Sequence, residues 1–106
     1  MKKLLLSLVL ASTLISTANA ATWVRGVYIV GIQPNCANTE LLRLFWSDKP
    51  SDKLNWNKTI CSRYAVDHAL TKSYMALGQG AMALGQKVDL ELSDHGYLND
   101  IIVRAD

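Results

Sequence analysis

The sequence has few of the side chains that hold metals or turn the chain sharply. It contains two cysteines, two histidines and two prolines in 106 residues. No Cys or His spacing typical of a metal site is present, so we expect neither a metal nor any other cofactor. Linkers and low-complexity runs are absent as well. The segment MALGQ occurs twice, at residues 75–79 and 82–86, which is too few units for a solenoid.

Long apolar runs are absent except near the N-terminus. There, Lys2 and Lys3 precede an apolar run at residues 4–10 that continues more weakly for a few residues, and Ala-Asn-Ala follows at residues 18–20. A basic start, a short apolar run and a small-residue ending predict a secretory signal peptide of bacterial style, residues 1–20. The protein would therefore be exported, to the periplasm or out of the cell.

No excess of charge remains once this leader is removed. Eleven basic residues include Lys2 and Lys3, so nine remain in residues 21–106, against nine acidic residues. A neutral chain without a basic, aromatic-rich stripe predicts no nucleic-acid partner. The apolar run is shorter than the roughly 18 to 20 residues that span a bilayer, so we also expect no membrane insertion.

The two cysteines, Cys36 and Cys61, both lie in the part of the chain that would be exported. An even pair in an exported chain most simply predicts one disulfide. A disulfide that closes a loop of about 25 residues stabilises the folded state by roughly 3 kcal/mol in the chain-entropy model. Such a contribution is important for a small single domain formed by residues 21–106. A metal site that adds His68 or His95 is the alternative, and no ligand spacing supports it.

Residues 66–85 have the periodicity of an α-helix. Side chains that recur at spacings of three and four define one face that must be covered: Val66, Leu70, Ser73, Tyr74, Leu77, Ala81 and Leu84. A second row has only small side chains, so a sheet or another helix could approach it closely: Ala69, Ser73, Ala76, Gly80 and Ala83. We expect Asp67 at the N-terminal cap or first turn and Gly85 at a left-handed C-terminal cap.

Five segments have the pattern of β-strands: residues 23–32, 40–46, 58–62, 87–93 and 101–105. Gly26 and Gly31, both in the first of these segments, permit a bulge or bend there. In residues 87–93 apolar and polar side chains alternate strictly, which is typical of a strand with one buried face. Residues 40–46 also fit a helix, but their aromatic side chains favour a strand. Turn-forming residues predict loops at residues 47–57 and 94–100.

Side chains for acid–base catalysis do not form a recognisable site. Asp-His neighbours occur at residues 67–68 and 94–95, but no nucleophile accompanies them. Asp89 and Glu91 project from the same face of one strand. A solvated strand face explains them better than a carboxylate pair for catalysis or ion binding. We therefore expect a protein without enzymatic activity.

Aromatic side chains are the best indication of a binding site. Trp56 stands in a polar loop among amides and a cation, and an exposed ring in such a setting is typical of carbohydrate recognition. The loop at residues 94–97 is a second candidate for the rim of a ligand-binding site. We expect Trp23 and Trp46 in the core. The candidate ligand-binding residues are Trp56, Asn55, Asn57, Lys58, His95 and Tyr97.

The order of these elements resembles the B subunits of bacterial AB5 toxins. Three strands and a helix are followed by Gly-Gln-Lys-Val at residues 85–88, which leads into an alternating strand, and by Ile-Ile-Val at residues 101–103. The enterotoxin B subunits end in a similar way. The subtilase-cytotoxin and pertussis-like B subunits place a cysteine pair before the helix, similar to Cys36 and Cys61. Small exported bacterial proteins of unknown function share this ending.

The resemblance implies an α+β fold, a small OB-like β-barrel with one helix. It also implies a ring oligomer, a pentamer, with the helices at its centre, and a cell-surface glycan as ligand. One feature departs from the enterotoxin pattern, because no cysteine lies in residues 87–93. The alternative is a periplasmic inhibitor or accessory protein that binds another protein through an edge strand or loop. A small hydrolase ranks below both.

Overall fold

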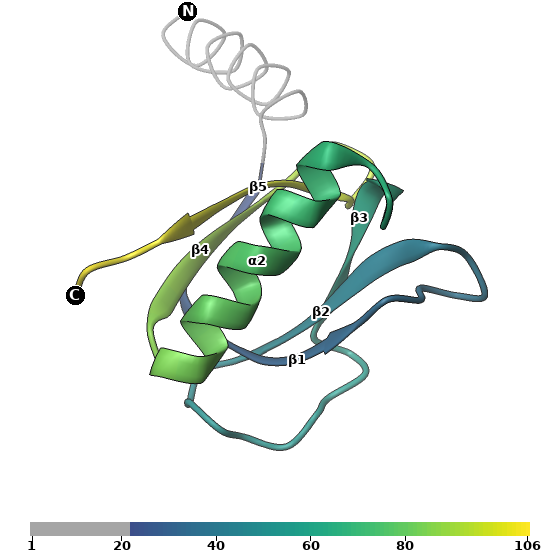
Figure 1. The fold of residues 1–106 in the computed structure, drawn as a ribbon. Helices are drawn as coiled ribbons and strands as arrows, with labels where there is room; N and C mark the ends of the chain where they lie inside the picture. The colour runs from purple at the N-terminus through teal and green to yellow at the C-terminus, as the bar shows by residue number, and fades with distance from the viewer. Residues whose placement is uncertain (1–21) are drawn as a thin grey trace, which may run out of the picture.

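The computed structural model describes residues 22–106, so the expected signal peptide, residues 1–20, lies outside the described residues. Within residues 22–106 the chain forms five strands and one helix (Figure 1). They are β1 (Thr22–Gln33), β2 (Leu41–Ser47), β3 (Thr59–Ala65), α2 (Ala69–Leu84), β4 (Lys87–Leu92) and β5 (Leu98–Val103).

The five strands form one sheet that closes into a ring in the order β1-β2-β3-β5-β4. The pairs β1–β2, β2–β3, β4–β5 and β1–β4 are antiparallel. The ring closes through β3 and β5, which run parallel and pair only at Ser62 and Leu98. The α2 helix crosses one side of this sheet (Figure 1). The predicted α+β class, a small closed sheet with one helix, is confirmed at this level.

Two strand boundaries were predicted wrongly by three residues each. We expected the last strand at residues 101–105, but β5 begins at Leu98, because Leu98 is 1% exposed and pairs with both β3 and β4. Asn99 and Asp100 lie on exposed positions of that strand and not in a loop. The third strand, expected to end at residue 62, continues to Ala65 beside β2.

The helix begins later than predicted, at Ala69, and its cap is His68 and not Asp67. His68 has an extended backbone, and its Nδ1 accepts the N–H of Leu70 at 3.1 Å. Val66 still donates its N–H to Glu40, so it extends the strand pairing of β3 instead of opening the helix. Gly85, with φ of 63°, forms the predicted left-handed C-terminal cap.

Two β-bulges let the long strand β1 turn apolar side chains inward along its whole length. The pairing with β4 shifts register between Val24 and Val27, where Gly26 has φ of 67°. The pairing with β2 shifts between Ile29 and Gly31. An extra residue at each bulge reverses the alternation of side chains, so inward positions are spaced by three there. The bulges anticipated at both glycines are confirmed.

Asp89 fills the first bulge and is 7% exposed. Its Oδ1 accepts the N–H of Gly26 at 2.8 Å, and Arg25 and Arg104 approach the carboxylate at 3.5 and 3.4 Å. The prediction of a solvated strand face was wrong for Asp89, because the bulge leaves a backbone N–H that needs a nearby acceptor. This carboxylate has a structural role in holding β1 to β4.

The core lies between the sheet and α2, and the row that the helix presents to it shares only Tyr74 and Ala81 with the predicted face. The buried residues of the helix are Thr71, Tyr74, Gly78 and Ala81. Since three of these side chains are small, α2 packs close to β1 and β2. The strands contribute Val27, Ile29, Leu42, Leu44, Ile60, Val88, Leu90, Leu98 and Ile101. Trp46 packs against this core as predicted, whereas Trp23 is half-buried and lies outside it, under Arg25.

The outer side of α2 is unusually apolar. Leu70, Leu77 and Leu84 recur every seven residues and are 42%, 43% and 74% exposed. The predicted small-residue row is also exposed, so it does not pack on the sheet: Ala69, Ser73, Ala76, Gly80 and Ala83. Lys72 is the single charged residue of the helix.

The predicted disulfide between Cys36 and Cys61 is present, with a Cα–Cα distance of 6.0 Å. Cys36 pairs with Thr39 across a tight turn at the tip of the β1–β2 hairpin. Ala37 and Asn38 both have positive φ there, as a two-residue primed turn requires. The disulfide therefore links this turn to β3.

Candidate binding site

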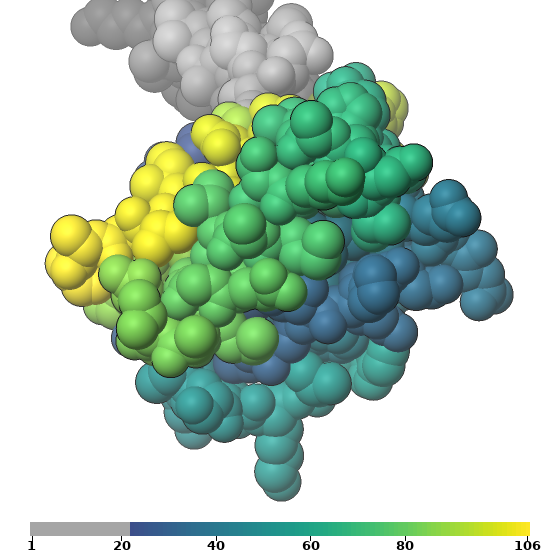
Figure 2. Space-filling view, viewed as in Figure 1, coloured from purple at the N-terminus to yellow at the C-terminus, as the bar shows by residue number. Residues whose placement is uncertain are grey.

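The loop between β2 and β3 folds back over the outer surface of β1 and β2. Leu54 lies over Gly31, where a β-carbon would meet Leu54 Cδ2 at 2.5 Å and Phe45 Cδ1 at 3.0 Å. Phe45, which points outward from β2, is consequently only 2% exposed. The absence of a side chain at Gly31 allows the loop to pack this closely. Figure 2 shows the loop, residues 48–58, projecting from the body of the protein.

Trp56 lies on the same outer surface and is the most exposed aromatic residue of the candidate site, at 60%. Phe45 meets it in an edge-to-face arrangement, with ring centroids 4.9 Å apart and planes at 85°. The guanidinium of Arg43 lies over the indole, 4.9 Å from its centroid. Since Arg43 and Phe45 are neighbours on one face of β2, they fix the indole from below and leave its remaining surface open to solvent.

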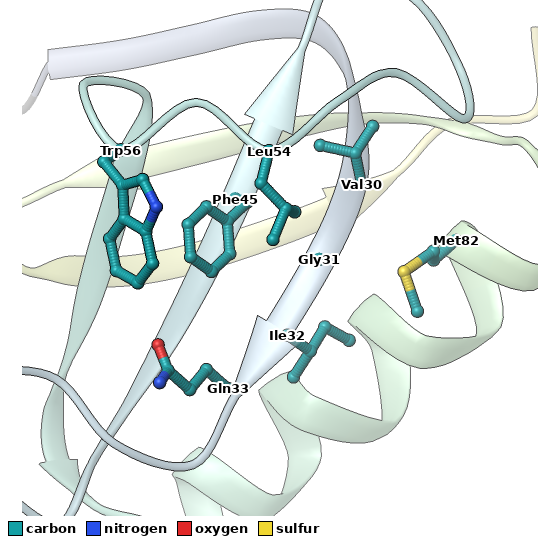
Figure 3. Close-up of a pocket in the computed structure, with 8 residues that line it drawn as sticks. All are labelled: Val30, Gly31, Ile32, Gln33, Phe45, Leu54, Trp56 and Met82. Carbon is teal, nitrogen blue, oxygen red and sulfur yellow. The ribbon is translucent and has the colours of Figure 1, made fainter.

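An open groove of about 510 Å³ runs between this loop, β1 and the C-terminal end of α2 (Figure 3). Its lining is apolar apart from one amide, that of Gln33. Met82 closes the groove on the helix side. The lining residues are Val30, Gly31, Ile32, Gln33, Phe45, Leu54, Trp56 and Met82.

Hydrogen bonds at both ends of the loop hold it in this position. Ser47 Oγ donates to Asp52 Oδ2 at 2.6 Å, and Lys53 donates its N–H to Asp52 Oδ1 at 2.8 Å. The hydroxyl of Ser47 is the main reason why the pKa of the Asp52 carboxyl is lowered from 3.8. Near Trp56, Asn55 Oδ1 accepts the N–H of Asn57 at 2.9 Å. The β2–β3 loop, which forms one wall of the groove, is therefore held in place by its own hydrogen bonds.

The structure places the predicted loop residues in different roles. Trp56 lines the groove, and Asn57 is exposed next to it. Asn55 is partly engaged in the turn. Lys58 lies over Trp46, 5.3 Å from the ring centroid, and pairs with Asp48 at 3.8 Å. The cation nearest to the Trp56 ring is thus Arg43 and not Lys58.

His95 and Tyr97 do not join this site. The end of β2 and the beginning of β4 both pair with Tyr28, so the β2–β3 loop lies at that end of the sheet. The β4–β5 turn, which carries His95 and Tyr97, connects the opposite end of β4 to β5. His95 is paired with Asp94 at 3.8 Å on the surface. The two candidate rims are therefore separate.

His68, which belongs to one of the two Asp-His pairs in the sequence, has a structural role. His68 caps α2 and stacks on Tyr64, with centroids 4.4 Å apart. Across residues 22–106, no three or more His, Cys, Asp and Glu side chains come together as a metal site would require.

Sequence reasoning missed most of the residues that shape the groove. Gly31, Gln33, Arg43, Phe45 and Met82 come from three elements far apart in sequence. Arg43 did carry a signal, as the single charged residue of strand β2. A glycine inside β1 was a second signal, because glycine in a strand often marks a close approach.

No family model, curated protein sequence or solved structure matches this chain. None of the described residues belongs to a helix long and apolar enough to cross a membrane.

Proposed function

We propose that this chain is a small exported protein without enzymatic activity that binds glycans through the groove beside Trp56. The observation that carries the proposal is the indole of Trp56, 60% exposed yet held in place by Phe45 and Arg43. A fixed aromatic ring stacks on the apolar face of a sugar at little entropic cost, because few of its rotamers remain to be lost. The groove beside the ring gives room for further contacts.

The proposed fold assignment is an OB-like barrel of the kind found in AB5 toxin B subunits, working as a ring oligomer. The exposed leucines of α2 support association, since monomeric proteins rarely expose contiguous apolar surface of this kind. The small-residue row beside them would allow a second helix to approach closely. A pentamer with helices at its centre would bring several Trp56 grooves into one particle, which raises the avidity for a surface that carries many glycans.

A glycan array, probed with the oxidised protein, tests the ligand class. We expect binding to a subset of glycans, and loss of that binding in Trp56→Ala. Tyr97→Ala is the matched control, because Tyr97 is an exposed aromatic residue, 40% exposed, at the other end of the sheet. Equal losses in the two variants, or no glycan bound by the unmodified protein, would contradict the proposal.

The second candidate is a periplasmic inhibitor or accessory protein that binds another protein. The apolar lining of the groove favours it, since Leu54 and Met82 would suit an aliphatic or aromatic side chain of a partner. Pull-downs from periplasmic extract distinguish the two functions. A partner that is retained by the unmodified protein and by Tyr97→Ala but lost from Trp56→Ala, together with an empty array, would favour this candidate.

A further inference from the structure

The two methionines of α2, Met75 and Met82, stand at the same position of the repeated segment MALGQ but in different surroundings. Since they are seven residues apart, they lie on nearly the same face of the helix. Met75 is partly buried and packs against the core. Met82 is 40% exposed, because the groove opens beside it. Of the two thioethers, Met82 is therefore the one that solvent reaches more easily.

Met82 is also the most exposed sulfur-containing residue among residues 22–106. Cys36 is 3% exposed and Cys61 is half-buried, and the two form the disulfide. No free cysteine competes for an oxidant in this part of the chain. The susceptibility of a sulfur to oxidation follows its exposure. A small oxidant that reaches the folded, disulfide-bonded protein therefore meets Met82 first.

The place of Met82 in the groove makes its oxidation relevant to binding. Figure 3 shows its side chain on the helix side of the groove, across from Leu54 and the residues of β1. The lining has one polar side chain, the amide of Gln33. A thioether suits such a lining, whereas a sulfoxide carries a polar oxygen that binds water. A ligand that covers this wall has to remove that water, which costs free energy.

We propose that Met82 is an oxidation site at which a peroxide lowers the affinity of the Trp56 groove for its ligand. This inference rests on the proposed function, since it takes the groove as the binding site. The sulfur of Met82 attacks one oxygen of hydrogen peroxide, so that an S–O bond forms and the O–O bond breaks. The departing hydroxide takes the proton of the transferred oxygen and leaves as water. The thioether loses two electrons and the peroxide gains them, and a methionine sulfoxide reductase reverses the change.

Mass spectrometry tests the site without any ligand. The folded, disulfide-bonded protein is treated with hydrogen peroxide, and trypsin then releases both methionines in one peptide, residues 73–87, whose fragments separate the two positions. We expect Met82 to gain oxygen at a rate at least about three times that of Met75. In urea, where neither residue is protected, the two rates should become equal. Equal rates in the folded protein would overturn the proposal.

The variant Met82→Leu keeps an apolar side chain of similar volume and removes the oxidisable sulfur. Met75→Leu is the matched control, because it makes the same exchange in the other copy of MALGQ. Amide NMR spectra establish that each variant is folded. After peroxide treatment, the signals of Val30 and Ile32, which line the groove with Met82, should shift in the unmodified protein and in Met75→Leu. In Met82→Leu they should stay in place.

A glycan array, probed before and after peroxide treatment, measures the effect on binding. We expect the treated unmodified protein and treated Met75→Leu to bind at least about threefold more weakly than before. Methionine sulfoxide reductases that act on both epimers should restore the binding. Met82→Leu should bind equally well before and after treatment.

The negative outcomes have different meanings. If treated Met82→Leu loses binding as the unmodified protein does, the oxidant acts elsewhere, for example on the exposed indole of Trp56, and the inference is wrong while the proposed function stands. Unchanged binding by a protein whose Met82 is oxidised has the same meaning. If the untreated protein binds no glycan, the proposed function fails and the effect on affinity fails with it, whereas the mass spectra still decide whether Met82 is the oxidation site.

Discussion

Gly31 is the residue on which the candidate groove most directly depends. A β-carbon there would lie 2.5 Å from Leu54 Cδ2, closer than carbon atoms can approach, so the side chain of Leu54 has to shift if the position is filled. The loop that contains Leu54 also carries Trp56. Gly31 of β1 therefore affects how the β2–β3 loop, which carries the indole of Trp56, packs on the sheet.

We expect Gly31→Ala to lower the free energy of unfolding by about 1–3 kcal/mol, the usual cost of overpacking, and to weaken ligand binding. Adding Leu54→Ala should restore part of the stability. Gly80→Ala is the control, because a β-carbon there meets nothing within 4 Å, and a helix gains about 1 kcal/mol from this exchange. Urea unfolding measures all three. Equal effects of Gly31→Ala and Gly80→Ala would contradict the packing argument.

Tyr74 is the one large side chain that α2 buries, and it joins the helix to β5. Its hydroxyl donates to the carbonyl of Asn99 at 2.6 Å. Burial is the main reason why the pKa of Tyr74 is raised from 10.0, and the nearby carboxylates of Asp100 and Glu91 add to it. Because the folded state favours the neutral phenol, this stabilisation is complete below pH 10 and is lost as the pH rises through the raised pKa.

We expect Tyr74→Phe to lower stability at neutral pH by about 1 kcal/mol, the net value of one hydrogen bond. The variant should also lose less stability than the unmodified protein as the pH rises above 10, since the titrating group has been removed. Unfolding in urea at several alkaline pH values measures this difference. Parallel loss of stability in both proteins would show that Tyr74 is not responsible.

At the scale of elements, the β2–β3 loop is fixed against the outer surface of the sheet at two places. Its first half is tied by the bond between Ser47 and Asp52, and its second half by the packing of Leu54 and Trp56. The pKa of Asp52 is lowered chiefly by the hydroxyl of Ser47, and next by the N–H of Lys53. This contribution is therefore present above pH 3.8 and is lost as the pH falls through the lowered pKa.

We expect the loop to loosen in acid before the sheet unfolds. Amide NMR should show the Lys53 signal moving below pH 3.8 while signals from β4 stay constant. In Ser47→Ala the titration of Asp52 should shift upward, toward 3.8, because its main hydrogen-bond donor is missing. An unchanged titration in that variant would exclude Ser47 as the cause.

For the whole molecule, the apolar outer side of α2 is the feature least consistent with a solitary monomer. Light scattering on the oxidised protein should give a mass near five subunits if the ring proposal is right. Replacing Leu77 by Lys places a charge in the middle of the exposed leucine row and should dissociate the particle, because the charge would be buried without a partner.

The matched control for this experiment is Leu54→Lys. Leu54 is also about half exposed but lies in the loop, away from the leucine row of α2. A monomeric mass for the unmodified protein would end the ring proposal and leave the Trp56 groove as a single site. An oligomer that Leu77→Lys does not dissociate would place the contact on another surface.

Local patterns in the sequence determined most of the elements, because each depends on near neighbours. The alternation in residues 87–93 predicted β4, Gly85 ended the helix where a left-handed residue was needed, and the cysteine pair predicted the disulfide. The glycines of β1 predicted the bulges for the same reason. Each of these features is governed by backbone conformation, or by chemistry that one or two residue types specify.

Tertiary structure alone decided which surfaces are covered and which residues meet. The leucines of α2 had the pattern of a buried face, yet the sheet covers Tyr74 and small residues instead, because Gly78 lets the helix approach Ile32 and Leu44 closely. Asp89 is buried because a bulge on another strand needs an acceptor. The groove joins Gly31, Phe45 and Trp56 through contacts between strands and a loop. Such contacts depend on register and packing across the closed sheet, and no local pattern contains that information.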